Sequence, residues 1–308
     1  MVRYLTRRFV YMFVALFIII SVTFFISKLL PGSPFADPKL TPEVRDQLFE
    51  KYGLDEPVYV QYLKYMGNVL QGDLGNSFFF ESRPVMQMIL TRLPVSMFIG
   101  IQAVIFGLIL GMVLGTIAAL RHNTLWDTLA VVVAIIGVSV PTFVLGPVLQ
   151  YWLGLKLGLF PIAFFDSYIY SIMPSLALSV FVISTVARFI RTEMLEVMGQ
   201  DYITLAKAKG LSGLAVIVRH VLRNAMIPLV TVMAPLTIYL ITGSLVVEQI
   251  FVVPGIGEQF VQSVVVSDYS MILGTTIFFS VMFILALLIQ DILYGIIDPR
   301  IRVAGAKE

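Results

Sequence analysis

The chain of 308 residues contains no cysteine. This absence excludes disulfide bonds, thiolate nucleophiles and cysteine-ligated metal sites. Charge is scarce as well, because Asp, Glu, Lys and Arg together make up 13% of the residues, the net charge is +2, and only two histidines are present. A chain so close to neutrality has no bulk electrostatic attraction for nucleic acid.

Apolar residues dominate the composition: 58% of the chain is hydrophobic and the mean hydropathy is +0.93. A soluble domain of this length needs a larger polar fraction to cover its surface. A helix that crosses the hydrocarbon layer takes ~20 apolar residues. The segments that qualify are 9–27, 93–120, 128–155, 167–187, 224–247 and 269–290. The sequence therefore predicts an all-α membrane protein with six transmembrane helices.

The distribution of Lys and Arg gives the orientation of these spans. Arg3, Arg7 and Arg8 precede the first apolar segment, which is longer than the ~7–15 residues of a signal peptide core, so we expect a retained span. With the N-terminus inside, 13 of the 21 basic residues fall on the inner side, the long segment 28–92 carries seven, and the short outer connections carry Lys156 alone. The positive-inside rule then predicts that both termini are cytoplasmic.

The centres of the predicted spans lack Asp, Glu, Lys, Arg and His. A charge at the bilayer centre costs roughly 2.5–3.5 kcal/mol, so proton-coupled carriers and ion pumps keep such residues only for function. His122 and His220 both lie in inner loops. The chain also lacks the G-x-x-x-x-G-K-[ST] pattern of a P-loop. Uphill transport by this protein would therefore take its energy from a partner.

The inner loop 188–224 has the strongest local pattern. Asp201 can cap a short helix over 202–209, Lys207 and Lys209 lie at its C-terminal end, and Gly210 can end it in the left-handed conformation. Two turns are too few for a helix to be stable alone in water, so it must rest against something. Two interpretations remain open with equal weight: a docking element for a cytoplasmic partner, or a basic loop that follows the positive-inside rule.

The run 201–211, followed by His220, Arg223, Asn224, Ala225 and Pro228, resembles the cytoplasmic EAA loop of ABC importer permeases. It is most similar to the B-type subunit of the dipeptide/oligopeptide (peptide/nickel) branch. The general EAA pattern itself is matched only at Ala206 and Gly210. Further segments are similar to motifs of that branch: 30–34, 52–55, 72–77, 139–143, 248–257 and 298–300.

The resemblance implies a type I ABC importer permease fold, a multi-pass location in a bacterial or archaeal cell membrane, and a translocation pathway for di- or oligopeptides. It implies these partners: a paralogous permease subunit, two cytoplasmic ATPase subunits that bind ATP and Mg, an extracytoplasmic substrate-binding protein, and the peptide. This chain would hold no cofactor, metal or catalytic residue of its own. The residues expected to couple it to the ATPases are Asp201, Tyr202, Ala206, Lys207, Ala208, Lys209, Gly210, His220, Arg223 and Asn224.

We expect three regions: 1–93, with the first span and an outer helical segment; 94–298, the permease core with the coupling loop 188–224; and the cytoplasmic tail 299–308. In the outer segment, Thr41 caps a helix that Gly53 ends, and a second helix runs from Pro57 to Gly72. Pro141, Pro228 and Pro235 each remove a helix hydrogen bond and predict kinks in the third and fifth spans. Hydroxyls that could bind a peptide backbone along the pathway are Ser139, Thr142, Ser175, Ser179, Thr231, Thr237, Thr242 and Ser244.

Three alternatives remain. A nickel or other small-solute importer of the same branch would have the same motifs. A non-transporting scaffold or receptor is disfavoured, because it needs no force-transmitting helix near Gly210. A membrane enzyme would need acid, base or metal ligands at membrane depth, and the spans lack them. The repeat Gly107, Gly111 and Gly115 predicts close helix packing inside the bundle, with a subunit seam as the less favoured interpretation.

Overall fold

The computed structural model describes residues 2–29, 35, 41–80 and 82–297, and the side chains of residues 6–29, 35, 41–80 and 82–293. The motif at 30–34, the motif at 298–300 and the predicted tail 299–308 lie outside the described residues. Helices make up nearly all of the regular structure in the described part. They are α1 (Val2–Leu29), α2 (Pro42–Lys51), α3 (Val58–Leu70), α4 (Val85–Leu120), α5 (Leu125–Ser139), α6 (Thr142–Leu149), α7 (Ile172–Met198), α8 (Asp201–Ala208), α9 (Gly213–Val216), α10 (Arg223–Ile241), α11 (Leu245–Phe251), α12 (Ile256–Val265) and α13 (Tyr269–Ile297).

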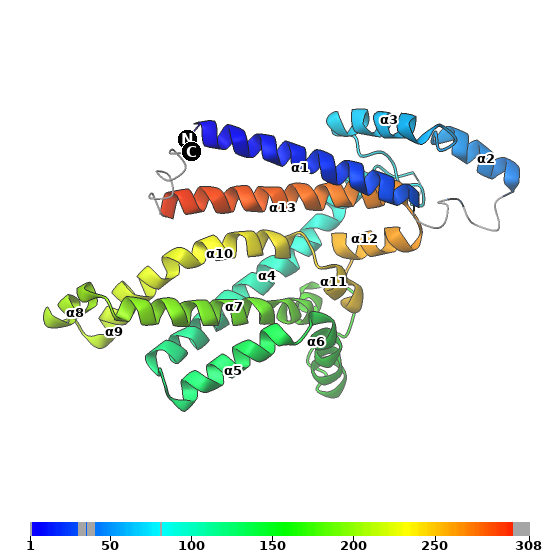
Figure 1. Cartoon of the computed structure of the whole chain (residues 1–308). Coiled ribbons are helices and arrows are strands. Elements are labelled where there is room, and N and C mark those ends of the chain that lie inside the picture. The colour runs from blue at the N-terminus through cyan, green and yellow to red at the C-terminus, as the bar shows by residue number, and fades with distance from the viewer. Residues whose placement is uncertain (1, 30–34, 36–40, 81, 298–308) are drawn as a thin grey trace.

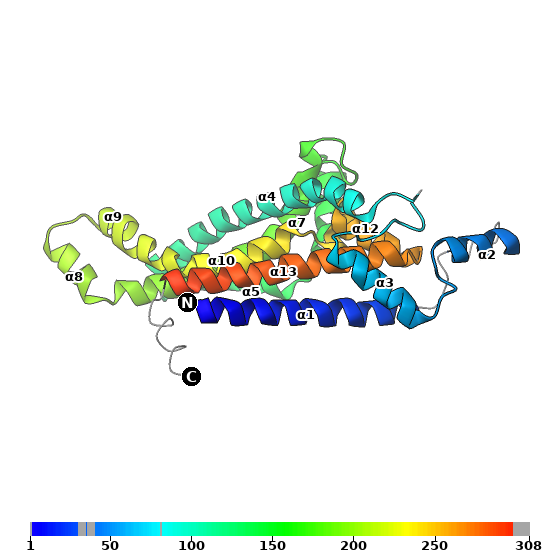
Figure 2. The ribbon, with the colours of Figure 1, turned by 90° about the horizontal axis from the view of Figure 1, so that it is seen from above.

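Five helical segments of the described chain are long and apolar enough to cross a membrane: 6–29, 85–120, 168–198, 213–241 and 269–293. They run roughly along one axis, with α8 and α9 at one end of the bundle and α2 and α3 at the other (Figures 1 and 2). We call these the α8 end and the α3 end. The start of α1 and the end of α13 both lie at the α8 end.

Helices α4 and α7 pack closely against each other through glycines. A Cβ atom on Gly107 would lie 2.3 Å from the Cβ of Val182, and one on Gly115 would lie 2.6 Å from the carbonyl oxygen of Ala187. Helices approach this closely only where side chains are absent. The repeat at 107, 111 and 115 thus packs inside the chain's own bundle, as predicted.

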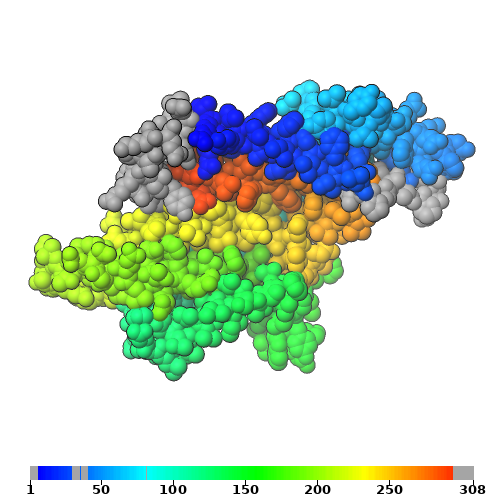
Figure 3. Space-filling model, in the orientation of Figure 1, coloured from blue at the N-terminus to red at the C-terminus, as the bar shows by residue number. Residues whose placement is uncertain are grey.

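The third predicted span, 128–155, is wrong as a single helix. Helix α5 ends at Ser139, and α6 continues into a π-helical turn, η1 (Gln150–Lys156), so that the two halves meet at 103° around Pro141. A lost hydrogen bond at proline explains a break here, because Pro141 has no N–H for the carbonyl of Gly137. The second half stands out sideways from the long helices (Figure 3). By length and composition, the described part therefore has five candidate spans, or six if this bent pair counts as one.

Two other predicted boundaries also change. Helix α7 does not stop at residue 187 but continues to Met198, carrying Arg188 and Arg191 within it. The fifth span starts earlier than predicted, because α9, a π-helical turn η3 (Ile217–Leu222) and α10 form one continuous helix that ends at Ile241. Residues predicted as its outer end instead belong to α11, after a turn at Gly243 with φ of +108°.

The α3 end is held together by caps and a buried carboxylate. Thr41 accepts a hydrogen bond from the Val44 N–H, as predicted for the start of α2. The fully buried Asp268 accepts hydrogen bonds from the Ser77 hydroxyl and from the Phe78 N–H, the latter at 3.1 Å. This contact fixes the loop before α4 to the start of α13.

Candidate functional site

Helix α8 begins one residue earlier than predicted. Gln200 occupies the N-cap position and makes no side-chain capping bond, while Asp201 is the first helical residue. The expectation that Asp201 caps the helix is therefore wrong, although its carboxylate still lies at the positive end of the helix dipole. Gly210 ends the element with φ of +81°, as predicted, and Ser212 then caps α9 by accepting the Ala215 N–H.

One face of α8 rests on the bundle. Ile203 and Ala206 are buried in the same apolar cluster as Met194 at the end of α7 and Val216 in α9. These contacts supply the support that a two-turn helix needs. Ala206, one of the predicted coupling residues, thus faces the bundle and positions the helix.

The other face of α8 and α9 is exposed and mostly apolar. Leu205 is 55% exposed and Leu214 is 73% exposed, with Tyr202 and Val218 also at the surface. Lys207 and Lys209 are exposed beside them. We call this surface, Tyr202, Leu205, Lys207, Lys209, Leu214 and Val218, the α8 face. Exposed apolar residues beside cationic ones suit contact with another protein, and the element projects from the bundle (Figure 2).

Hydrogen bonds join α8 to the start of α10. The Asn224 side-chain amide donates to the Tyr202 hydroxyl at 3.3 Å and to the His220 carbonyl oxygen at 2.8 Å. The structure thus brings together three of the predicted coupling residues from two helices. Arg223 is exposed on the same helix. The bond to Tyr202 is thus a direct side-chain link between α8 and the start of α10.

A buried ion pair at the α8 end was missed by the sequence analysis. The Asp127 carboxylate accepts bonds from Arg191 Nε at 2.6 Å and from a second guanidinium nitrogen at 2.9 Å, and from the Asn123 N–H at 3.0 Å. His122 Nδ1 lies 3.0 Å from the same carboxylate. The pair ties α5 to the part of α7 that carries α8. Its partners are far apart in the chain, so no local pattern could reveal it.

The predicted pathway hydroxyls divide into three groups. Those that are buried and bonded to backbone carbonyls are Ser175, Ser179, Thr231 and Thr242. Ser244 caps α11 by accepting the Val247 N–H. Ser139 is exposed, and Thr142 and Thr237 are half-buried. A pathway role stays a prediction for all of them.

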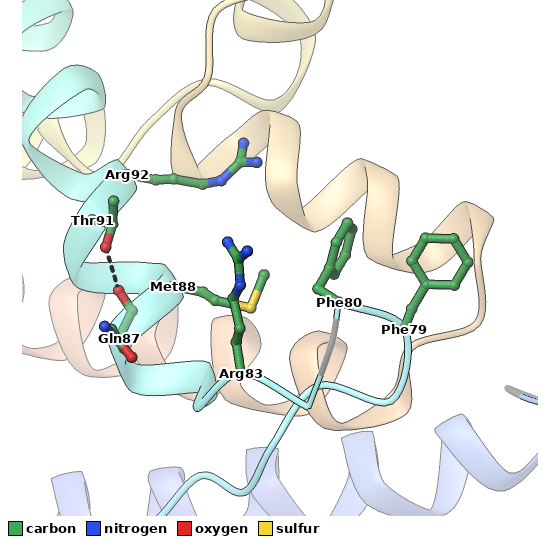
Figure 4. Close-up of a pocket in the computed structure, with 7 residues that line it drawn as sticks. All are labelled: Phe79, Phe80, Arg83, Gln87, Met88, Thr91 and Arg92. Carbon is green, nitrogen blue, oxygen red and sulfur yellow. Dashed lines mark hydrogen bonds between the residues drawn. The ribbon is translucent and has the colours of Figure 1, made fainter.

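A cavity of about 510 Å³ opens at the α3 end between the loop before α4 and the first turns of α4 itself. Figure 4 shows the Arg83 and Arg92 side chains reaching into it opposite Phe79 and Phe80. Arg92 also pairs with Glu258 of α12 at 2.5 Å. The cavity joins polar and aromatic groups at the end of the bundle remote from α8.

Beside this cavity, Glu248 organises the turn between α11 and α12. The carboxylate is 1% exposed and accepts bonds from the Gly257 N–H at 2.8 Å and the Glu258 N–H at 3.1 Å. Ser96 of α4 accepts the Ile256 N–H at 2.9 Å. The motif at 248–257 thus forms a buried cluster of hydrogen bonds that joins α4, α11 and α12.

Two family models match the chain. The model described as "Binding-protein-dependent transport system inner membrane component" matches residues 111–303, and the corresponding N-terminal model matches residues 1–100. The chain is 44% identical to the dipeptide transport system permease protein DppB of Lactococcus lactis, over 98% of this chain and 100% of the relative. It is 38% identical to the oligopeptide transport system permease protein OppB of Escherichia coli K12, with the same coverage.

Solved structures share the fold at lower identity. The inward-facing MetNI methionine ABC transporter contains a chain with a TM-score of 0.54 and 15% identity, covering 69% of this chain and 97% of its own. An amino acid ABC transporter crystallised with histidines gives a TM-score of 0.51, also at 15% identity, over 70% of this chain and 94% of its own. At such identity the likeness establishes the fold alone.

Proposed function

The chain belongs to the family of binding-protein-dependent transport system inner membrane components, and from that membership we propose that it is the permease subunit of an ATP-driven importer that carries dipeptides or oligopeptides. Full-length relatives at 38–44% identity are dipeptide and oligopeptide permeases. Such identity along the entire chain favours peptides over nickel or another small solute. The chain itself is a non-catalytic subunit.

The energy for transport comes from other subunits in this proposal. Two ATPases bind ATP and Mg below the membrane, a related permease completes the pathway, and an extracytoplasmic binding protein delivers the peptide. The α8 end is then cytoplasmic, together with both chain termini, in a bacterial or archaeal cell membrane. The concentration of basic residues on the segments of that end supports this orientation.

The single observation that carries the coupling role is the two-sided α8 element. Its inner face is buried on the ends of α7 and α9, while the α8 face is open to a partner. We place one ATPase against the α8 face, so that closure of the ATPase pair moves α8 and, through Tyr202 and Asn224, also α10. Along the pathway, Ser139, Thr142 and Thr237 are the hydroxyls best placed to bind a peptide backbone.

A matched pair of glycine substitutions tests the coupling role. Gly210 and Gly213 both have open space around an added Cβ, but only Gly210 has a positive φ. A side chain in the left-handed region costs roughly 1–2 kcal/mol, so Gly210→Val should turn the chain away from its path while Gly213→Val should not. We expect Gly210→Val to insert normally and to lose at least tenfold in labelled peptide uptake.

The measurement compares uptake with ATP hydrolysis in the purified transporter. Uncoupling predicts that Gly210→Val retains ATPase subunits on co-purification in mild detergent but no longer transports, while Gly213→Val does both. Normal peptide uptake by Gly210→Val would refute the coupling role. Uptake of nickel rather than peptide in a deletion strain would refute the assignment of peptides as the transported substrate.

A further inference from the structure

The second half of the bent span forms an arm, defined here as residues 142–156. It turns away from α5 at 103° and projects sideways from the row of long helices (Figures 1 and 3). Its base is fixed: a Cβ on Gly146 would lie 3.2 Å from the Ile250 side chain, and the Gln150 amide donates to the Ile250 carbonyl oxygen at 3.1 Å. The direction of the arm is therefore set by α11.

Away from these contacts, the exposed surface of the arm is apolar. The large side chains that stand exposed on it are Phe143, Val144, Val148, Tyr151, Trp152 and Leu155. Its polar residues are Thr142, Gln150 and Lys156, and the Gln150 amide is used at the base. A helix that lies among lipid headgroups has one polar face and one apolar face. The arm lacks such a division, so its surroundings must be apolar throughout.

The backbone at the base of the arm argues against lipid as those surroundings. Helix α5 is 15 residues long, which places the break ~22 Å from its start, within a hydrocarbon layer of ~30 Å. Ser139 and Pro141 are exposed there, and Pro141 offers no N–H to the preceding turn. Irregular backbone at membrane depth is tolerated only where protein covers it or where it lines a water-filled cavity.

We propose that the arm packs against a second membrane-spanning permease subunit and that the break at 139–142 faces the boundary between the two subunits. The proposal rests on the function proposed above, in which two permeases form one pathway. An ATPase or a binding protein would meet the α8 or α3 end, whereas a sideways arm at the depth of the spans reaches only lipid or another membrane subunit. Exposed Trp and Tyr side chains, here Trp152 and Tyr151, are common anchors of such interfaces.

Photo-crosslinking in the assembled transporter tests the arm. The photoreactive residue p-benzoylphenylalanine replaces Trp152, which is 57% exposed, or, as the matched control, Tyr59 of α3, which is 66% exposed. After illumination of native membranes, we expect the variant at 152 to form an adduct of this chain with the second permease at least fivefold above the variant at 59. Mass spectrometry identifies the partner.

The outcomes separate the arm from the proposed function. Adducts at 152 that contain only phospholipid, or only this chain, overturn the assignment of the arm, even if ATPases co-purify and peptide uptake is normal. An adduct with a second permease in a complex that contains no ATPase supports the arm and overturns the function. Equal permease adducts at 152 and 59 also overturn the assignment, because the contact would then not be specific to the arm.

Discussion

Replacing Gly100 by alanine should separate α4 from α10, while the same change at Gly67 should stabilise the protein. A Cβ on Gly100 would lie 2.4 Å from the carbonyl oxygen of Leu240 and 2.7 Å from the Ile241 nitrogen. Ordinary van der Waals contact begins at 3.4 Å, so the two backbones must move apart by 3.4 − 2.4 = 1.0 Å. Main-chain atoms cannot rotate away as a side chain can.

The cost follows from overpacking, which is typically ~1–3 kcal/mol. We take the upper end, because backbone is displaced, and subtract the ~0.5–1 kcal/mol that alanine gains over glycine in a helix. The net loss in the free energy of unfolding is about 2 kcal/mol, equivalent to a fall in Tm of roughly 4–8 °C. Gly67 lies inside α3 with nothing within 4 Å of an added Cβ. At Gly67 only the stabilising effect of alanine relative to glycine in a helix applies, so Tm should rise by roughly 1–4 °C.

Thermal unfolding of the purified transporter in detergent, followed by circular dichroism, measures both variants. Opposite signs for one chemical change are the expected result. If Gly100→Ala leaves Tm unchanged, or if both variants shift it in the same direction, the close approach of α4 and α10 is wrong.

Two further variants test buried polar groups by the same measurement. Asp127→Ala should lower the free energy of unfolding by about 3 kcal/mol. This is near the lower end for a broken buried ion pair, because the Arg191 side chain keeps 26% of its surface exposed. The double variant Asp127→Ala/Arg191→Met should recover part of the loss, and no recovery would contradict the pairing. Glu248→Ala should lower the free energy of unfolding by about 2–4 kcal/mol, since it leaves the Gly257 and Glu258 N–H groups without their acceptor. Gln249→Ala, at the exposed neighbour, should change it by less than about 0.5 kcal/mol. Equal effects of the two variants would count against the buried hydrogen-bond cluster around Glu248.

The long apolar spans could be predicted because length and hydropathy are local properties. A kink at Pro141 could be predicted as well, but a complete break of the span there could not. Pro228 and Pro235 both remain inside the continuous helix α10, so a proline in an apolar run does not by itself distinguish a tolerated kink from a 103° turn. What fixes the turn is the contact of Gly146 and Gln150 with α11, about 100 residues further along the chain.

The coupling element was partly predictable. The turn at Gly210 and a two-turn helix before it follow from local residue preferences, and the structure has both, with the helix over 201–208 instead of the predicted 202–209. The inner face of Ala206 and the link from Tyr202 to Asn224 depend on how α8 folds back onto the bundle. The end of α7 was misplaced because Arg188 and Arg191 were read as the end of a span. A helix continues through charged residues wherever the chain has left the apolar layer or, as with Arg191, wherever a buried partner neutralises them.

Helix α7 has 27 residues, is ~40 Å long, and is contacted near its middle by the glycines of α4, at Val182 to Ala187. It is also held near both ends, because Ser175 donates to the Ile99 carbonyl oxygen of α4 and Arg191 bonds to Asp127 of α5. A push at Met198, where α8 is attached, should therefore move α7 together with α4 and α5. The protein would then carry motion between its two ends as one packed unit of three helices, without a relay of small rearrangements.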